Sequence, residues 1–514
     1  MFSSGPDLSY EELNQLNHRG PDYQAIERRH GMSFGHVRLS IQDLSSRSNQ
    51  PYCDDENILL FNGEIYNCDE LVNRFGLDVD YSSDTAVLFE GLVKIGTNFL
   101  KYVNGMYAVL FYDGDSIVIA RDPAGVKCLY FTIGYESLCI SSEIKGLVNL
   151  KELSLRSDLE IIYKLFRFIP APLTAFEGVN KLQAGELISF KRNENGIFSQ
   201  VNSEKIEYQG RRHPIRTAIR SQLISDVPVA SLISGGVDSS LISTAVEGIK
   251  FYHAKNDSGY KSEVNNVLNN RFVRQNLNII NIDRLSLESH IISVIEEPVT
   301  ANSIYFLREL MANINETVIL AGQGGDELFF GYKRYRLALV HDILRFCGFS
   351  SLLKRLKMDG ELSRLTNLFV FNKNIEKIAL LLGADPKDVH RSVKFLSSLY
   401  PQFDLMDNLT LTEAIVKFDR EYSLPDELLI YTDKISMLYS KEVRVPLLDL
   451  SIIRIEPYSF QGLINLFIPK FTLRLLAISR GVFPKWVKIG FDYDLGIPKT
   501  SFQNFVWKEL KTKQ

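Results

Sequence analysis

The sequence predicts a chain of two parts: an α+β region rich in short strands, then an α/β region with a parallel sheet and extra C-terminal helices. Short apolar runs punctuated by Gly, Asn and Asp fill about the first 190 residues. Strand-like and helix-like runs then alternate, and helical patterns dominate from about residue 335. A length of 514 residues also exceeds that of one ordinary core.

The strand-rich region is predicted from three runs, ENILLFNGEIYN (56–67), MYAVLFYDGDSIVIARD (106–122) and ESLCISSE (136–143). The polar stretch 191–214 is the best candidate for a connection between the two parts. We therefore expect a first domain over 1–195, a linker over 196–210 and a second domain over 211–514.

The second region alternates in the way that parallel sheets require. RTAIRSQLI has helical spacing, VPVASLIS is strand-like, SSLISTAVEGI is helical and KFYHAKN is again strand-like. Farther on, IEKIALLLG and LTEAIVKF have helical spacing. This order predicts a parallel sheet wrapped by helices, followed by a helical region.

Composition excludes several classes of protein. A net charge of −4 argues against nucleic acid or a membrane surface as the main partner, although it leaves room for a local basic patch. Five scattered cysteines without a CxxC pair indicate neither a disulfide framework nor a zinc site. The sequence contains no apolar run of ~20 residues and its first residues lack a signal-peptide pattern, so we expect a cytoplasmic protein.

Two glycine-rich stretches have the same pattern, SLISGGVDSSLIS (231–243) and TVILAGQGGDELFFGY (317–332). In each, an apolar strand runs into glycines, and an aspartate follows. Glycines let backbone N–H groups close on an anion, and a helix beginning near Asp238 adds partial positive charge. Asp238 and Asp326 then suit Mg²⁺ bound to phosphate. For either stretch alone, a glycine turn with a helix-capping aspartate is the competing interpretation, and the GxxxxGK[ST] pattern of a P-loop is absent.

The chain resembles glutamine-dependent asparagine synthetase over nearly its whole length. The matching segments in the first half are HRGPD (18–22), GHVRLSIQD (35–43), NGEIYN (62–67), SSDT (82–85), RDPAGVKCLY (121–130) and SSEIKGL (141–147). Those in the second half are DVPVASLISGGVDSS (226–240), GQGGDELFFGY (322–332), SLPDELLIYTDKISM (423–437), KEVRVPLLD (441–449) and FPKWVKIGF (483–491).

The resemblance implies a class II glutamine amidotransferase domain, with an Ntn-hydrolase-like αββα sandwich, followed by a PP-loop ATP-pyrophosphatase domain. It implies adenylation of the aspartate side-chain carboxylate, then attack by ammonia with release of AMP. It also implies ATP and Mg²⁺ as cofactors and a homodimer as one option. The residues it assigns to ATP are Leu232, Ser234, Gly235, Gly236, Asp238, Ser239, Ala321 and Gly322; those it assigns to the metal are Asp238 and Asp326.

The same resemblance assigns catalytic roles in the second half to Gln323 and Lys488. Lys488 matches a lysine that steadies charge on the adenylate or pyrophosphate, and Lys470 is a weaker candidate for that work. Gln323 stands where many relatives have glutamate, so it could orient an intermediate but not take a proton. Phe330 stands where a second glycine is usual, which we interpret as a packing difference.

The glutamine pocket is also matched residue by residue. Arg38 corresponds to the arginine that pairs with the α-carboxylate of glutamine, and Asp84 to the carboxylate that takes its ammonium group. Asn62 and Gly63 correspond to the oxyanion-hole donors, and Glu64 to a further binding residue. Each residue alone could be structural, but their order together favours a retained pocket.

The family's nucleophile is an N-terminal cysteine, and this chain begins Met-Phe-Ser-Ser. Cys53 lies far inside the chain and has no free amine, so we interpret it, like the other four cysteines, as a small hydrophobic residue. Either a strand with the cysteine precedes Phe2, or the domain is a scaffold and the enzyme uses free ammonia or another amine. Glutaminase assays of this chain and of one extended upstream in the gene separate the two hypotheses.

The leading functional prediction is an amide ligase that uses ATP, aspartate and glutamine or ammonia. One alternative is amidation of another carboxylate, such as a sugar uronic acid or a natural-product precursor, for which residues 371–402 could shape the acceptor site. A third is a non-catalytic regulatory homologue, against which the intact Asp238, Asp326 and Lys488 argue.

Overall fold

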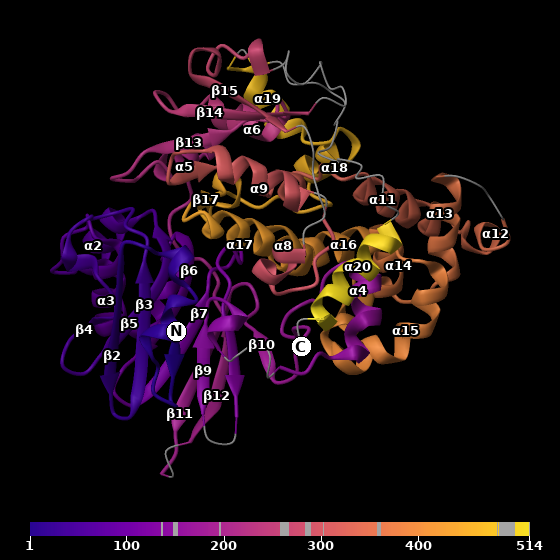
Figure 1. The fold of residues 1–514 in the computed structure, drawn as a ribbon. Helices are drawn as coiled ribbons and strands as arrows, with labels where there is room; N and C mark the ends of the chain where they lie inside the picture. The colour runs from indigo at the N-terminus through magenta and orange to yellow at the C-terminus, as the bar shows by residue number, and fades with distance from the viewer. Residues whose placement is uncertain are drawn as a thin grey trace.

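The computed structural model describes residues 1–134, 137–147, 153–194, 197–256, 267–282, 289–301, 303–356, 361–480, 482 and 499–512. Figure 1 shows the strand-rich N-terminal part on one side, the smaller sheet above it and a group of helices extending to the far side.

The N-terminal part consists of two six-stranded antiparallel sheets. In the first sheet the strand order is β10-β8-β9-β1-β3-β2, and in the second it is β12-β11-β7-β6-β5-β4. The first sheet contains β1 (Phe2–Ser3), β2 (Tyr23–Arg29), β3 (Met32–Arg38), β8 (Tyr130–Ile133), β9 (Leu138–Ser141) and β10 (Val179–Lys181). The second contains β4 (Tyr52–Cys53), β5 (Ile58–Ile65), β6 (Gly105–Tyr112), β7 (Ser116–Arg121), β11 (Glu186–Arg192) and β12 (Phe198–Lys205).

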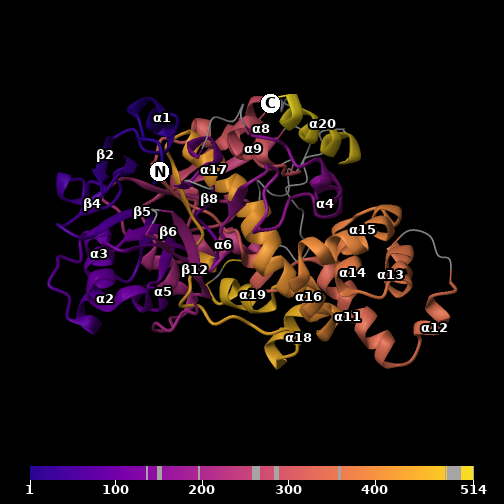
Figure 2. The ribbon, with the colours of Figure 1, turned by 90° about the horizontal axis from the view of Figure 1, so that it is seen from below.

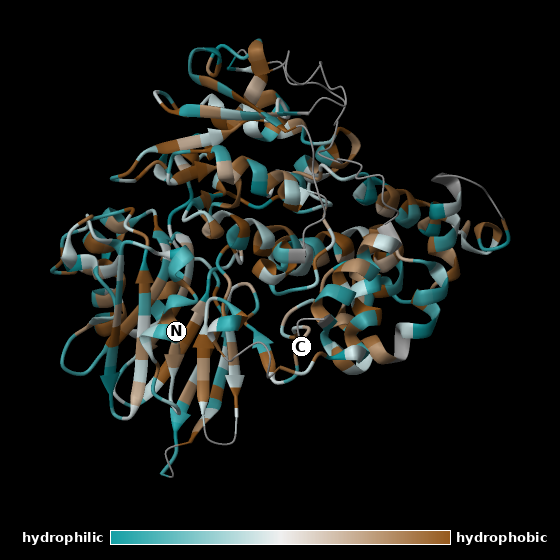
Figure 3. Ribbon diagram, viewed as in Figure 1, coloured by the Kyte–Doolittle hydropathy of each residue, from teal (hydrophilic) through white to brown (hydrophobic). Residues whose placement is uncertain are grey.

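Alternation of side chains along the strands builds two separate cores. Leu60 and Leu110 join residues of the first sheet, such as Phe34, in one buried cluster. Their neighbours Leu59 and Phe111 point the opposite way, into a cluster with the helices α2 (Cys68–Phe75) and α3 (Asp84–Ile95). The strand-rich prediction for this region is therefore confirmed, and Figure 3 shows apolar residues along its inner strands.

The second sheet continues farther along the chain than the polar composition of 191–214 suggests. Residues Phe198–Lys205 form the edge strand β12, which pairs with β11 from Glu186 to Arg192. Seven of its eight residues are exposed, so its sequence has the polarity of a linker, while backbone pairing holds it in the sheet. The segment 206–214 that follows contains no strand or helix.

The second part contains a five-stranded, wholly parallel sheet of order β15-β14-β13-β16-β17, which confirms that prediction. Adjacent residues alternate between its two faces: Phe251 and Leu320 join a cluster with the helix α5 (Ile215–Ser221), whereas Tyr252 and Ile319 join the main core. The strands are β13 (Val229–Leu232), β14 (Lys250–Asn256), β15 (Leu277–Ile282), β16 (Val318–Leu320) and β17 (Glu442–Arg444).

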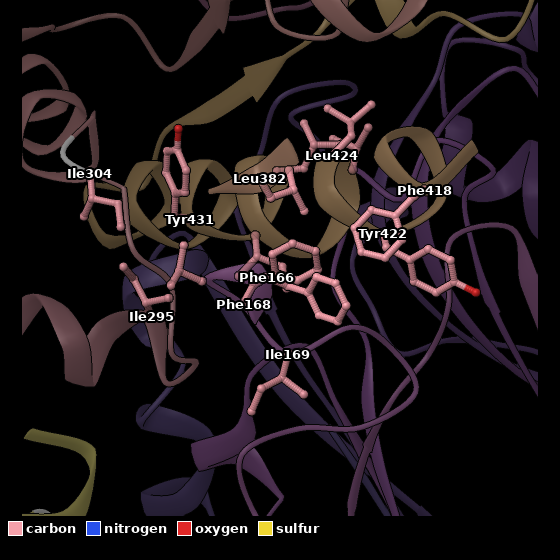
Figure 4. Close-up of a cluster of buried hydrophobic side chains, with 14 of the residues drawn as sticks. Phe166, Phe168, Ile169, Ile295, Ile304, Leu382, Phe418, Tyr422, Leu424 and Tyr431 are labelled. Atoms are coloured by element: carbon pink, nitrogen blue, oxygen red, sulfur yellow. The ribbon is translucent and has the colours of Figure 1, made fainter. Parts of the chain in front are cut away.

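Helices dominate the rest of the chain, as the spacing after residue 335 predicts (Figures 1 and 2). Phe166, Phe418 and Tyr431 meet with other aromatic and aliphatic side chains in the buried cluster of Figure 4. They come from the helices α4 (Glu160–Phe166), α16 (Leu411–Phe418) and α17 (Ile430–Leu438). The remaining helices are α1 (Tyr10–Asn14), α6 (Val237–Ser243), α8 (Ser289–Ile295), α9 (Ser303–Asn313), α10 (Gly325–Leu328), α11 (Lys333–Phe346), α12 (Ser350–Leu353), α13 (Glu361–Val370), α14 (Asn374–Leu382), α15 (Pro386–Leu399), a π-helix (Asp419–Leu429), α18 (Phe460–Phe467), α19 (Phe471–Ile478) and α20 (Lys499–Thr512).

No single helix in the described ranges has both the length and the apolar composition needed to cross a membrane. The pair α18 and α19, which is bent by 85°, meets those criteria only when the two helices are taken together.

Candidate functional site

The two glycine-rich stretches lie side by side at one edge of the parallel sheet. β13 and β16 are neighbours, with Ser231 paired to Leu320, so the turns that follow them leave the sheet together. Gly235 and Gly324 adopt φ values of 77° and 85°, a left-handed conformation that glycine takes without strain. The sequence-assigned ATP residues Leu232, Ser234, Gly235, Gly236, Asp238, Ser239, Ala321 and Gly322 all belong to β13, β16 or the segments that follow these strands.

The first turn is held by its own serines. The backbone N–H of Ser234 donates to Oγ of Ser239 at 3.1 Å, and the two hydroxyl groups lie 3.0 Å apart. Gly322 of the second turn packs directly against this segment, since a Cβ at Gly322 would lie 3.0 Å from the backbone N of Ser239. A larger residue at 322 would therefore push the two turns apart.

Asp238 and Asp326 converge on one cation. The ammonium group of Lys470 forms ion pairs with both carboxylates, and its Nζ lies 2.9 Å from Oδ1 of Asp326. Gly325 makes this convergence possible, because a Cβ there would lie 2.5 Å from Oδ1 of Asp238. From the sequence, the proximity of these two aspartates was a hypothesis. In the structure both of them form ion pairs with the same buried lysine.

Lys470 is buried and positively charged. Burial by itself lowers the pKa of the ammonium group, but Asp238 and Asp326 outweigh burial and hold the pKa above its usual value. The resemblance favours Lys488 over Lys470 for steadying charge on the adenylate or pyrophosphate, but Lys488 lies outside the described residues. Lys470 directly precedes α19, and its φ of 58° is a left-handed conformation.

Two carboxylates that meet beside a glycine-lined turn form the set of oxygen donors that Mg²⁺ prefers. The close packing of Gly325 and Gly322 against Asp238 and Ser239 leaves backbone rather than side chains around them. These residues therefore fit a magnesium-bound phosphate chain, with Lys470 as the nearby cation.

Hydrogen bonds determine the orientation of the Gln323 side chain. The Thr432 hydroxyl donates to the carbonyl of Leu428 at 2.7 Å, so its oxygen must accept the 2.8 Å hydrogen bond from Nε2 of Gln323. The amide oxygen Oε1 of Gln323 is buried and has no hydrogen-bond partner among the described residues. Gln323 thus presents an acceptor beside the glycine turn.

Phe330 occupies a backbone conformation that favours glycine, with φ of 55°. Its ring is fully buried, packs edge-on against Tyr335 at 5.9 Å and lies under the guanidinium of Arg420. Packing of the ring accounts for this departure from the family pattern. The next residue, Gly331, is the one glycine of the usual pair that this chain keeps. A Cβ at Gly331 would collide with Oδ1 of Asp326, so no side chain fits there.

A second site lies in the N-terminal part, in a cavity of about 100 Å³. This volume is several times the ~10–15 Å³ that one water molecule requires. All five residues that the sequence assigned to glutamine, namely Arg38, Asn62, Gly63, Glu64 and Asp84, line this cavity. Met1 lines it as well, and so do Met437 and Glu442 from the second part of the chain.

Arg38 is largely engaged by its own loop. Its Nη1 donates to the carbonyl of Ser45 and to Oδ1 of Asn49, both at 2.8 Å. Its Nη2 donates to the carbonyls of Gln42 and Asp43. These four contacts use the N–H groups of Nη1 and Nη2, and the fifth donor of the guanidinium group is the Nε–H.

Two buried carboxylates face the same cavity. Burial raises the pKa of Asp84 to about 6, although the backbone N–H of Ile65 donates to this carboxylate at 3.3 Å. Burial also raises the pKa of Glu64 well above its usual value, which the guanidinium of Arg444, 3.3 Å away, opposes. Asp84 therefore changes charge just below neutral pH.

Asn62 and Gly63 lie on β5 and line the cavity. Asn62 reaches Ser142 with its Nδ2 at 3.4 Å. A Cβ at Gly63 would collide with the backbone of Met106 and lie 2.8 Å from Cα of Tyr107, and φ of Gly63 is 151°. Only glycine lets β5 and β6 pair at this level.

The cysteines stay away from this cavity. None of the five is among the described residues that line it. Cys68 and Cys128 are buried and Cys139 is half-buried, as expected for small hydrophobic residues, but Cys53 and Cys347 are exposed. For these two the sequence interpretation was wrong, because Cys53 lies on the edge strand β4 and Cys347 at the end of α11.

A chain of buried charges of alternating sign connects the two parts of the protein. Arg19 of the first part and Asp433 of the second form an ion pair at 2.8 Å, and Lys127 lies 3.2 Å from Asp433. Glu442 faces both Lys127, at 3.8 Å, and Arg444, at 2.8 Å. In order, the series is Glu143, Arg19, Asp433, Lys127, Glu442, Arg444 and Glu64.

Of the residues in this chain of charges, which ends at the cavity, only Glu64 had a predicted role. The only signal available was the presence of charged residues inside otherwise apolar segments, as in EVRVPLL. The partners in these ion pairs lie hundreds of residues apart in the sequence. Sequence spacing therefore could not predict which charges pair across the two parts.

Comparisons with known proteins cover both parts. Residues 4–200 match the family described as "Glutamine amidotransferase domain", and residues 211–455 match the family described as "Asparagine synthase". A solved structure described as glutamine phosphoribosylpyrophosphate amidotransferase from B. subtilis shares 14% identity with a TM-score of 0.29, over 55% of this chain and 80% of that one. That similarity is too low to support an argument.

Two relatives are similar over most of their length. "Putative asparagine synthetase [glutamine-hydrolyzing] 2" from Methanocaldococcus jannaschii is 27% identical over 84% of this chain and 96% of its own. "Asparagine synthetase [glutamine-hydrolyzing] 1" from Bacillus subtilis is 30% identical over 85% of this chain and 76% of its own. With both domains, both glycine turns and the cavity residues in their expected order, the chain belongs to the family of glutamine-hydrolysing asparagine synthetases.

Proposed function

We propose that the protein is an ATP-dependent amide ligase that converts aspartate to asparagine. The side-chain carboxylate of aspartate attacks the α-phosphate of ATP, a P–O bond to pyrophosphate breaks, and an acyl adenylate forms. Ammonia then attacks the acyl carbon, and AMP leaves with the electrons of the C–O bond. The observation that supports this best is the convergence of Asp238, Asp326 and Lys470 beside two glycine turns.

In this proposal the two turns bind the phosphate chain. The backbone N–H groups around Gly235, Gly236 and Gly322 donate to phosphate oxygens, because no side chain intervenes there. Asp238 and Asp326 would hold Mg²⁺, which neutralises charge on the leaving pyrophosphate when bound. Lys470 then supplies a fixed positive charge at the same place, and Lys488 is a further candidate for that work.

Gln323 has an orienting role in the proposal. Its amide oxygen is fixed by the hydrogen bond from its own NH₂ group to Thr432, and it is therefore ready to accept an N–H. The N–H groups of the attacking ammonia are suitable donors. An amide does not take a proton at neutral pH, so the proton released in this step must go elsewhere.

For the first part we propose a glutamine pocket in an Ntn-hydrolase-like αββα sandwich covering about residues 1–195. The α-ammonium group of glutamine pairs with Asp84, and the α-carboxylate takes the Nε–H of Arg38 or displaces loop oxygens from its Nη atoms. Asn62 and Gly63 donate to the side-chain amide oxygen of bound glutamine, with Glu64 as a further binding residue. The cytoplasm, where ATP and both amino acids are available, is the proposed compartment.

An exchange assay tests the proposed reaction. The protein with Mg²⁺, ATP and aspartate should incorporate labelled pyrophosphate into ATP, because adenylation is reversible before ammonia is added. Glutamate, which has one more methylene group, should support exchange about 10–200-fold less well. Exchange with a uronic acid instead of aspartate, or with none of a panel of acids, would overturn the assignment.

Glutamine binding should depend on pH through Asp84. A carboxylate with a pKa of about 6 is mostly ionised at pH 7 and mostly neutral at pH 5, while glutamine itself keeps its charges. The ion pair with the ammonium group is therefore lost on acidification, and the dissociation constant measured by calorimetry should rise about tenfold from pH 7 to pH 5.

Asp84→Asn is the matched variant for this measurement, since it removes the titrating group and keeps the size. Its binding should be weak and should change less between pH 5 and pH 7 than that of the unmodified protein, because position 84 no longer titrates, whereas Glu64, whose pKa is also raised by burial, still does in the cavity. Equal affinity of the unmodified protein at both pH values would refute the role given to Asp84.

A further inference from the structure

The far end of α11 and the turn into α12 expose large apolar side chains to solvent. The exposed fractions are 92% for Phe346, 47% for Phe349 and 57% for Leu352. Figures 1 and 2 both show α12 at the extremity of the helical region, away from all three sheets. We call residues 343–356 the apolar-basic tip.

Charge on the tip is one-sided. The 14 residues ILRFCGFSSLLKRL contain three cations, Arg345, Lys354 and Arg355, and no acidic residue, although the whole chain has a net charge of −4. All three cations are exposed. The nearest preceding acid, Asp342, is turned to α16, where Thr412 donates to it from both its backbone N–H and its hydroxyl.

Apolar side chains of this size at a protruding end, next to cations, are costly to leave in water and mark an interaction surface. A symmetric contact with a second copy of the chain would bring the same cations of both copies together and so is disfavoured. An anionic lipid surface satisfies both features, since it accepts apolar side chains at the acyl boundary and basic ones at the headgroups.

We propose that the apolar-basic tip docks the protein on anionic membrane surfaces. Phe346, Phe349 and Leu352 insert at the boundary between headgroups and acyl chains, and the three cations contact the headgroups. Binding is reversible, because the inserted area is small and only three cations take part.

Docking of this kind leaves the nucleotide turns accessible. α11 begins at Lys333, close behind Asp326, and its 14 residues carry the chain about 21 Å to the tip. Substitutions at the tip should therefore leave aspartate-dependent pyrophosphate exchange with soluble substrates unchanged, which serves as the check on folding.

Vesicle flotation tests the proposal. The full chain should float with phosphatidylcholine vesicles that contain about a third phosphatidylserine, float much less with pure phosphatidylcholine vesicles, and be released as salt screens the headgroups. Phe346→Ser/Phe349→Ser and, separately, Lys354→Glu/Arg355→Glu should each weaken partitioning by about tenfold or more.

Matched controls distinguish the tip from general surface effects. Tyr10→Ser/Val201→Ser removes exposed apolar side chains elsewhere, and Lys387→Glu/Lys508→Glu makes the same change in net charge on α15 and α20. Both controls should float like the unmodified protein. The proposal is wrong if no flotation occurs, if the controls lose as much as the tip variants, or if light scattering shows that Phe346→Ser/Phe349→Ser only dissociates a dimer.

Discussion

Replacing Asp326 with asparagine is expected to lower aspartate-dependent pyrophosphate exchange by about 10²–10³-fold, the size of effect seen when one preorganised electrostatic contact is removed. Asparagine has the same shape as aspartate and keeps an oxygen, so the glycine packing around Gly331 remains. It removes the negative charge that a divalent cation requires. The loss should therefore appear in the reaction and not in the fold.

The fold is checked by the thermal unfolding of the nucleotide-free protein. Asp326→Asn leaves Lys470 paired with Asp238, so the protein should still unfold in one cooperative transition, at a melting temperature lowered by the loss of one buried ion pair. Asp55→Asn, at an exposed position far from the turns, serves as the matched control for exchange. Exchange by Asp326→Asn within threefold of the unmodified rate would show that the two turns do not form the proposed metal site.

The elements around this site could be predicted because local pattern determines them. The alternation of strand and helix from residue 216 to 256 predicts a parallel sheet, and neighbouring parallel strands end at the same edge. The glycines of both turns follow from the need for left-handed φ and close approach, as at Gly235 and Gly324. These elements can be predicted because each depends on residues that are close together in the sequence.

Other features depend on contacts that no local pattern records. β12 looks polar because it is an edge strand, and only its pairing with β11 reveals it. Lys470 reaches Asp238 from 232 residues away. In the same way, the orientation of Gln323 follows from Thr432, which belongs to a helix 109 residues farther along the chain. In each case the partner is chosen by tertiary packing, which sequence spacing does not encode.

The chain of charges between the two parts makes Asp433 the position with the largest expected effect on stability. Asp433→Ala leaves Arg19 and Lys127 buried beside each other with one carboxylate fewer, which should lower the free energy of unfolding by about 3–5 kcal/mol. Urea unfolding followed by circular dichroism measures this loss. Asp55→Ala, an exposed control, should lie within about 0.5 kcal/mol of the unmodified protein.

The pH dependence identifies the cause of that loss. Burial raises the pKa of Asp433, but Arg19 and Lys127 outweigh burial and hold it below the usual value for aspartate. The stabilisation is therefore fully present above the unfolded pKa of about 4 and disappears as the pH falls through the lower folded pKa. The difference between the unmodified protein and Asp433→Ala should then shrink below about pH 4. Asp433→Asn keeps the size and one acceptor oxygen, but its NH₂ group replaces the other oxygen and faces Arg19 or Lys127, which are themselves donors. It should therefore lose about as much as Asp433→Ala, about 3–5 kcal/mol. A loss under 1 kcal/mol for Asp433→Ala at pH 7 would mean that Glu143 and Glu442 neutralise both cations without Asp433, and the two parts would then be joined mainly by their shared apolar core.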